Sequence, residues 1–347
     1  MTLAIPKEKQ GVLDSLIGFP TQVAAAFKAA KDHVFHSDIN DISNILILGM
    51  GGSGIVGDYM RVLLRNSQFP VYLNKHSIAP KFVNEKSLVL AVTYSGKTQE
   101  TLNALQVCIN SSAKVVVITG SHELASTCKE RDLPCIKIPA HSHSRTSLGY
   151  LLVSAMSVLQ HANVLKMSEH ETTETIQVLK KIKNDCAVED SDGGPARQLA
   201  MGLANRFPII YGEYNFTDAV ALRWKQQFNE NAKTPCYHDV FPELLHNEIE
   251  TWHGSMAHNY SLIFLRDYLY EEEADLLQKI DAAKEIMPEN LHFREFWSKG
   301  RSELARLLSL TYLGDLASAY LAKAKGVDPS SVKNIELAKS GFVKGAI

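Results

Sequence analysis

Short, almost uninterrupted apolar segments alternate with longer amphipathic segments through the first half of the chain. The apolar segments are Asn44–Leu48, Val71–Asn74, Leu88–Thr93 and Lys114–Thr119. Apolar runs without polar alternation are typical of strands that are covered on both faces, as in a parallel sheet between layers of helices. The segments between them, such as Val56–Asn66 and Thr101–Ser111, are predicted helices. This order of elements predicts a doubly wound α/β domain.

The second half begins another unit of the same class. A helical stretch at Ser147–Leu165 ends the first unit, and the chain is then largely polar as far as Arg206, with a break at Glu189–Pro195. The predicted strands of the second unit are Phe207–Gly212, Thr234–Tyr237 and Ser261–Leu265, and long helices follow to the C-terminus. The length of 347 residues suits two domains of about 150 residues each. We predict an N-terminal domain over residues 1–165 and a C-terminal domain over residues 166–347, each a parallel sheet flanked by helices.

A glycine-rich turn, Gly49-Met50-Gly51-Gly52-Ser53-Gly54, directly follows the first predicted strand and opens a helix. Glycines allow a tight turn and close approach of a ligand, and a helix N-terminus offers free N–H groups to an anion. A dinucleotide site would need an acidic residue about 20 residues further on, at the end of the second strand. The chain has Asn74-Lys75-His76 there. The sequence therefore disfavours NAD(P), and we predict no cofactor.

A second loop rich in hydroxyl groups, Thr93-Tyr94-Ser95-Gly96-Lys97-Thr98, follows the third strand and precedes another helix. Side-chain O–H and backbone N–H groups at such a junction can surround one phosphate, although the same residues also form helix-capping boxes. Two such loops at the carboxyl ends of strands in one sheet favour phosphate binding. The predicted phosphate-binding residues are Gly51, Gly52, Ser53, Thr93, Ser95, Gly96 and Thr98.

This pair of loops resembles the sugar isomerase (SIS) domain. Its signature is Gly-Gly-Ser-Gly, followed some forty residues later by Ser-x-Ser-Gly-x-Thr-x-Glu-Thr. This chain has Thr93 for the first serine of the second motif, which keeps the hydroxyl, and Lys97 where the family usually has asparagine. The resemblance implies a five-stranded parallel sheet between helices and a phosphosugar ligand.

A candidate general base lies in the second half. Ala221, Trp224 and Phe228 have the i, i+3, i+7 spacing of a buried helix face, and this helix is predicted to end near Glu230. A carboxylate at a helix C-terminus faces the negative end of the helix dipole, which makes it more basic. By itself the pattern favours a solvated glutamate at a helix end over a catalytic base.

Further segments extend the resemblance to the bifunctional phosphoglucose/phosphomannose isomerases, over nearly the whole chain and in collinear order. The matching segments are Ser144–Tyr150, Phe228–Lys233, His246–Ile249, Tyr312–Leu321, Gly326–Pro329 and Ile335–Lys339. The resemblance implies interconversion of glucose 6-phosphate and mannose 6-phosphate with fructose 6-phosphate through a cis-enediol.

The same resemblance implies four residue roles. Glu230 corresponds to the catalytic base, His246 to the ring-opening histidine, Arg145 to the active-site arginine and Lys339 to the C-terminal lysine. Because the family usually has leucine before that lysine and this chain has Ala338, Lys344 is the fallback for Lys339. Arg145, His246 and Lys339 would also bind substrate. In the family the histidine comes from the neighbouring subunit, which implies a homodimer.

Charge and cysteine usage narrow the remaining possibilities. The chain has 36 Lys and Arg against 38 Asp and Glu, a net charge of −2, so neither nucleic acid nor a membrane surface is a predicted partner. The start of the chain lacks the pattern of a signal peptide. Five cysteines, none in a C-x-x-C motif, favour free thiols in the cytoplasm. His141, His143, His246 and His253 match no standard zinc spacing, so no metal is predicted.

Two alternatives remain at this point. The chain could isomerise another phosphosugar, such as an amino sugar, or it could be a non-catalytic phosphosugar-binding regulator. Glu230, His246 and Arg145 together favour the enzyme over the regulator. If Glu230 is not the base, Glu248 is the next candidate.

Overall fold

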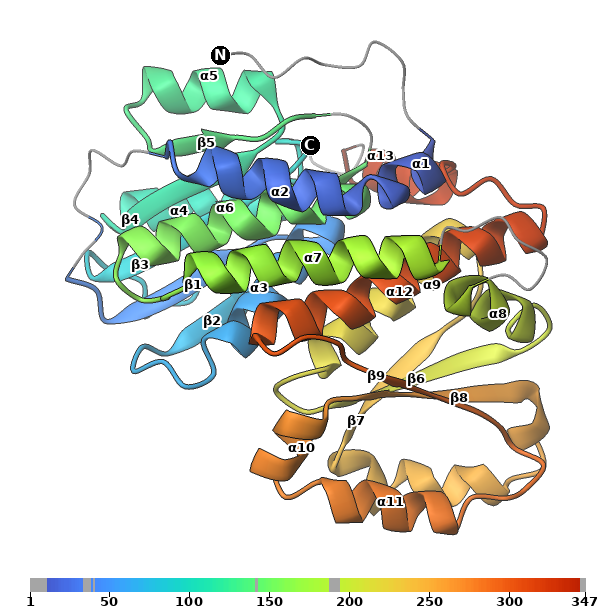
Figure 1. Cartoon of the computed structure of the whole chain (residues 1–347). Coiled ribbons are helices and arrows are strands. Elements are labelled where there is room, and N and C mark those ends of the chain that lie inside the picture. Colours follow the sequence, from blue (N-terminus) through green and yellow to red (C-terminus); the bar gives the residue numbers. More distant parts are fainter. Residues whose placement is uncertain (1–10, 34–38, 40, 141–142, 187–193, 344–347) are drawn as a thin grey trace.

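The computed structural model describes residues 11–33, 39, 41–140, 143–186 and 194–343 and shows two parallel sheets with helices packed around them (Figure 1). Most of the break predicted at residues 189–195, as well as Lys344, lies outside the described residues. The two α/β units predicted from the sequence are present.

The first sheet has five parallel strands in the order β2-β1-β3-β4-β5. They are β1 (Asn44–Leu48), β2 (Val71–Asn74), β3 (Ser87–Val92), β4 (Lys114–Thr119) and β5 (Cys135–Lys137). The helices of this half are α1 (Val12–Ile17), α2 (Phe19–Ala30), α3 (Gly51–Leu63), α4 (Gln99–Asn110), α5 (His122–Glu130), η1 (Ser144–Thr146) and α6 (Leu148–His161). The four strands predicted for this half are confirmed, and β5 was not predicted.

Alternate residues of the central strands point to opposite faces of the sheet, and both faces are apolar. Ile45 and Ile47 of β1 pack in one core with α2, α3 and α6, whereas Leu46 and Leu48 pack in a second core with α4 and α5. This arrangement explains why β1, β3 and β4 read as continuous apolar runs.

The second sheet has four parallel strands in the order β7-β6-β8-β9. They are β6 (Phe207–Glu213), β7 (Tyr237–Phe241), β8 (Tyr260–Arg266) and β9 (His292–Trp297). The helices of this half are α7 (Glu169–Cys186), α8 (Pro195–Gly202), α9 (Asp218–Ala232), η2 (Glu243–His246), η3 (Glu248–His253), η4 (Ala257–Asn259), α10 (Tyr268–Glu273), α11 (Leu277–Glu285), α12 (Glu303–Ala324) and α13 (Lys333–Val343).

Two sequence predictions for this half were wrong. The strand placed at residues 234–237 begins instead at Tyr237, because Thr234 stays at the end of α9, where its N–H donates to the carbonyl of Phe228. The strand β9 was missed. Its sequence, HFREFW, mixes polar with aromatic residues and is only partly buried because β9 lies at the edge of the sheet. It therefore lacks the apolar run that marks the central strands.

Helix α12 joins the two halves of the molecule. It packs against α1 of the first half and against α7, α8 and α9, and it lies between the two sheets in Figure 1. Residues from Leu304 to Ala322 are buried on all sides except at Leu313. One continuous apolar core therefore runs from the first sheet through α12 to Ile210 and Ile263 of the second.

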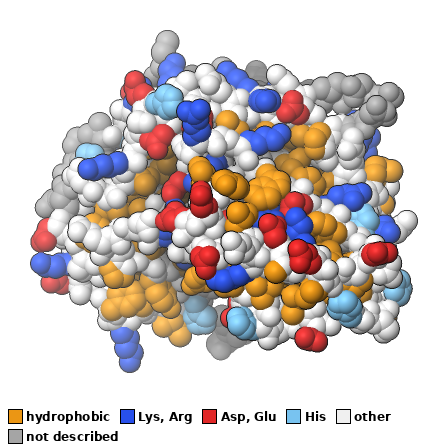
Figure 2. Space-filling view, turned by 60° about the horizontal axis from the view of Figure 1, so that its bottom comes forward, with side chains coloured by type: hydrophobic (Ala, Val, Ile, Leu, Met, Phe, Trp, Pro, Cys, Tyr) orange, Lys and Arg blue, Asp and Glu red, His pale blue; other side chains and the backbone are white. Residues whose placement is uncertain are grey.

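The surface matches the balanced charge of the chain. On the face shown in Figure 2, acidic and basic side chains are interspersed among groups of apolar ones. Within the described residues, none of the helices is long and apolar enough to cross a membrane.

Candidate active site

The two predicted phosphate loops lie side by side because β1 and β3 are neighbours in the first sheet. The glycine-rich turn forms the first turn of α3, and the loop after β3 leads into α4. One hydrogen bond joins them directly, since the backbone N–H of Tyr94 donates to Ser53 Oγ at 3.0 Å. Ser53 is buried, so its side chain fixes the spacing of the two loops.

The hydroxyl groups of the second loop do not form a helix-capping box. Thr98 is the N-cap of α4, but its side chain makes no capping hydrogen bond. Ser95 is exposed, and its Oγ accepts from the N–H of Lys97 at 3.2 Å and lies 3.5 Å from Thr98 Oγ1. The buried Thr93 Oγ1 has no hydrogen-bond partner among the described residues. These hydroxyl groups therefore retain hydrogen-bonding capacity that an anion could use.

Gly52 lies where no side chain would fit, because η1 packs directly against it. A Cβ at this position would lie 2.8 Å from both the backbone nitrogen of Arg145 and Ser144 Oγ. The short helix η1, which carries Arg145, thus rests directly on the glycine-rich turn. The contact couples the position of Arg145 to that of the predicted phosphate loop.

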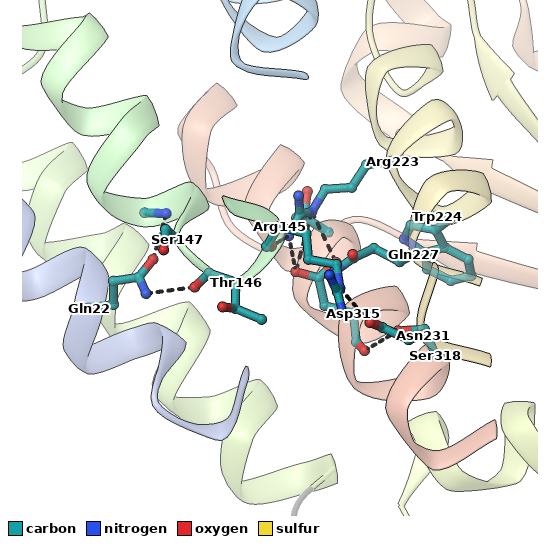
Figure 3. Close-up of polar contacts among 12 residues, drawn as sticks. Gln22, Arg145, Thr146, Ser147, Arg223, Trp224, Gln227, Asn231, Asp315 and Ser318 are labelled. Atoms are coloured by element: carbon teal, nitrogen blue, oxygen red, sulfur yellow. Dashed lines mark hydrogen bonds and ion pairs between the residues drawn. The ribbon is translucent and has the colours of Figure 1, made fainter. Parts of the chain in front are cut away.

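Arg145 reaches from η1 into the second half of the molecule, where it meets α9 and the chain after α12 (Figure 3). Its Nε donates to Asn231 Oδ1 at 2.8 Å, Nη1 to Glu230 Oε2 at 3.3 Å, and Nη2 to the carbonyl of Pro329 at 2.6 Å. The side chain is buried, and this burial lowers the pKa of Arg145, while the charge of Glu230 opposes the shift. The predicted arginine and the predicted base are therefore in direct contact.

A buried ion pair holds the backbone of Arg145 in place. Arg223 Nη2 donates to the carbonyl oxygen of Arg145 at 2.8 Å and to Asp315 Oδ2 at 2.6 Å. Gln227 donates to the other carboxylate oxygen of Asp315 at 2.9 Å. Figure 3 shows these residues of α9 and α12 converging on Arg145. Sequence reasoning missed them, although Asp315 is the only acidic residue between Glu303 and Asp328, which was an available signal.

Glu230 lies in the last turn of α9, as predicted, and is partly exposed. Its side chain is 24% exposed, and its carboxylate faces the Arg145 guanidinium. The carboxylate is therefore reachable from solvent, fixed in direction and next to a positive charge.

Lys233 is a further cation at this site that was not predicted as a site residue. It ends α9 in the left-handed conformation, with φ of 51°. Its Nζ donates to the carbonyl oxygens of Glu230 and Ser331. Burial lowers the pKa of Lys233, and the nearby charge of Arg145 lowers it further. Lys233 thus ties the end of α9 to the segment that also bonds Arg145.

The structure does not bring the other two predicted residues to this place within the single chain. His246 ends η2 and is exposed, and Lys339 lies on an exposed part of α13. Among the described residues, no recorded contact joins either of them to Arg145 or Glu230. Glu248, the alternative base, points elsewhere, since its Oε1 accepts from the hydroxyl of Tyr211 at 2.6 Å.

The remaining titratable groups do not gather into an evident metal-binding set. Within the part of the chain that the structure describes, no group of three or more His, Cys, Asp or Glu side chains could hold a metal ion. His141 lies outside that part.

Comparison with known proteins gives matches over both halves. Residues 38–162 match the family model of the SIS domain, and residues 193–341 match that of the bacterial phospho-glucose isomerase C-terminal SIS domain. A hypothetical protein from Thermus thermophilus has a similar crystal structure, with a TM-score of 0.73 and 16% identity over 97% of this chain and 91% of that one. The structural likeness supports the same fold.

Sequence relatives are closer. The bifunctional phosphoglucose/phosphomannose isomerase of Caldicellulosiruptor bescii is 32% identical over 95% of this chain and 98% of its own length. The protein of the same name from Aquifex aeolicus is 30% identical over 89% of this chain and 93% of its own length. The chain belongs to the family of bifunctional phosphoglucose/phosphomannose isomerases.

Proposed function

We propose that this protein interconverts glucose 6-phosphate and mannose 6-phosphate with fructose 6-phosphate. The observation that carries the proposal is the placement of Arg145. Its backbone rests on Gly52 of the predicted phosphate loop, and its side chain contacts Glu230. A substrate whose phosphate lies at that loop would extend its sugar toward Glu230.

Glu230 suits the proton transfer between C1 and C2 of the open-chain sugar. A single carboxylate on one face of a cis-enediol can remove a proton from one carbon and return it to the other. Glucose and mannose phosphates differ only at C2 and share one enediol. One base at one position can therefore serve both reactions.

Arg145 suits the stabilisation of the enediolate. A guanidinium stays charged and carries five N–H donors, of which three are used by Asn231, Glu230 and Pro329. The other two donors have no partner among the described residues and can serve the oxygens on which negative charge develops. The bonds to α9 and to the chain after α12 fix their direction before substrate arrives.

His246 is proposed to open the sugar ring from a neighbouring subunit in a homodimer. A histidine titrates near neutral pH and can move a proton between O1 and O5. The residue is exposed on η2, which would allow it to enter the site of a second copy. We propose that Lys339 of α13 contacts the ring oxygen or O1 of the sugar. We also propose that the protein is cytoplasmic and that its two domains divide between residues 165 and 166.

A coupled assay of the purified protein on glucose 6-phosphate and mannose 6-phosphate, each with and without EDTA, tests this function. We expect turnover of both substrates, and we expect it to survive chelation. Failure on both phosphohexoses, together with turnover of an amino-sugar phosphate, would overturn the proposed substrate. Complete loss in EDTA with recovery in zinc would overturn the metal-independent mechanism.

A further inference from the structure

The segment Glu243–His253, formed by η2 and η3, is attached to the core of the second half by its apolar side chains. Leu244 and Trp252 are buried there beside Phe264 of β8, and Leu245 and Ile249 pack partly against the same cluster. His246 lies on the opposite, exposed side. The direction of the imidazole therefore depends on how firmly this segment is held.

Glu248 is the carboxylate of this segment that faces inward. Its Oε1 accepts a hydrogen bond of 2.6 Å from the Tyr211 hydroxyl, which in turn accepts one of 3.1 Å from Trp252 Nε1. Tyr211 is fully buried on β6. Glu250, two residues further along, is exposed and has no such partner among the described contacts.

A second carboxyl group lies against Glu248. Asp239 of β7 is paired in the register of the sheet with Tyr211, the residue whose hydroxyl donates to Glu248, and its carboxyl group interacts with that of Glu248. Two carboxyl groups can share a hydrogen bond only if one of them holds a proton. Burial and the neighbouring Asp239 raise the pKa of Glu248 to about 7, although the bond from Tyr211 opposes this shift.

In the described part of the chain, no cation is paired with Glu248 or Asp239 to offset their negative charge. The groups that face Glu248 are Tyr211 from β6, Asp239 from β7 and Trp252 from η3 itself, and no ion pair of either carboxylate is recorded among the described residues. His238 adjoins Asp239 on β7, but burial lowers the pKa of this histidine, which disfavours its charged form. The rest of the surroundings is the apolar cluster. Loss of the shared proton would therefore leave two neighbouring, half-buried negative charges that repel each other.

We propose that Glu248 is a positioning residue whose proton, shared with Asp239, holds the η2–η3 segment and so fixes His246 for its task. The proposal rests on the proposed function, in which His246 opens the sugar ring. As pH rises through neutrality, the two carboxylates repel each other and the segment loosens. The catalytic rate on cyclic sugar phosphate falls with it.

The test uses Glu248→Gln, because glutamine keeps the protonated shape: its amide can donate to Asp239 and its carbonyl can accept from Tyr211. The wild-type kcat on glucose 6-phosphate should fall about tenfold between pH 6.5 and pH 8.5. In Glu248→Gln the decline over this range should be less than twofold. The matched control Glu250→Gln, on the exposed side of the same segment, should follow the wild-type profile.

A second variant provides the same test if Glu248→Gln does not fold. Asp239→Asn removes the negative charge on β7 that faces Glu248, and it should also flatten the pH profile. An unchanged alkaline decline in whichever variant folds would overturn the proposal.

Hydrogen exchange separates this proposal from the proposed role of His246. Amides of residues 243–253 should lose protection across pH 7 in the wild type, after correction for intrinsic rates, and keep it in Glu248→Gln. If protection changes as expected while kcat does not vary with pH in either protein, Glu248 does hold the η2–η3 segment, but the role proposed for His246 is wrong. If protection does not change with pH in the wild type, the proposal that Glu248 holds this segment is wrong.

Discussion

A methyl group at residue 52 would collide with the backbone of Arg145, 2.8 Å away. We expect Gly52→Ala to shift η1 and to lower kcat by about 10- to 100-fold, because small displacements of a catalytic group cost large factors in rate. Gly202→Ala is the matched control, since a Cβ there meets only His292 at an ordinary 3.6 Å. Steady-state kinetics on both variants check this, and equal kcat values would show that η1 need not rest on Gly52.

Replacing Arg145 by lysine keeps the charge but removes the planar fork. A lysine cannot reach Asn231, Glu230 and Pro329 at once, and it leaves buried acceptors unsatisfied. We expect Arg145→Lys to lose about 10²–10³ in kcat, with a smaller change in KM for either substrate. Arg131→Lys, on the surface beyond α5, should behave like the wild type. A kcat within threefold of the wild type in Arg145→Lys would contradict the role given to this side chain.

At the level of single residues, the sequence indicated Arg145 and Glu230 from separate motifs, and the structure places the two side chains in contact. The sequence could not indicate Arg223 and Lys233 in the same way. Arg223 acts on a backbone carbonyl of Arg145, 78 residues away in the chain, and Lys233 acts on the carbonyls of Glu230 and Ser331. Every residue has a backbone carbonyl, so the sequence does not show which carbonyl a side chain will bind.

Between elements, the Arg223–Asp315 pair links α9 to α12 and is almost fully buried, with side-chain exposures of 2% and 0%. Burial raises the pKa of Asp315, and the charge of Arg223 counteracts the shift. Removing one partner leaves the other charge buried and unpaired, which costs about 3–5 kcal/mol. We expect Asp315→Ala to lower the free energy of unfolding by that amount in urea denaturation.

The double variant Arg223→Met, Asp315→Leu separates stability from function. Apolar side chains of similar size can replace a buried pair with little loss of stability, so its free energy of unfolding should recover most of the deficit. Its kcat should stay low, because the carbonyl of Arg145 has lost its donor. Recovery of both quantities would mean that this pair has no part in positioning Arg145.

The elements predicted best are those whose pattern has one physical cause. Strands β1, β3 and β4 are covered on both faces and therefore read as apolar runs. Strand β9 escaped notice because its position at the sheet edge allows His, Arg and Glu among its residues and interrupts the apolar run. The boundary of β7 was misplaced because Thr234, a good strand former, is held by the end of α9 instead.

For the whole molecule, the proposed homodimer predicts complementation between two inactive proteins. Glu230→Gln lacks the base and His246→Ala lacks the ring-opening group. If each site takes its histidine from the partner subunit, one of the two sites in a mixed dimer contains both groups. Random reassociation of equal amounts makes half of the dimers mixed, so about a quarter of the wild-type activity should return.

The control for this experiment is a mixture of Glu230→Gln with Arg145→Lys. Both residues belong to one chain and contact each other, so every site in a mixed dimer keeps one defect and no activity should return. Recovery in neither mixture would show that His246 serves its own chain or no site at all.

Removal of the C2 hydrogen by Glu230 is tested most directly by solvent deuterium exchange. In heavy water, the wild-type protein should incorporate deuterium at C2 of both glucose 6-phosphate and mannose 6-phosphate. Glu230→Gln keeps the shape of the side chain but cannot accept the proton. Its kcat on both substrates should fall together by about 10²–10⁴, and C2 exchange should disappear, while KM changes little. Near wild-type turnover and exchange in Glu230→Gln would contradict the assignment of the base.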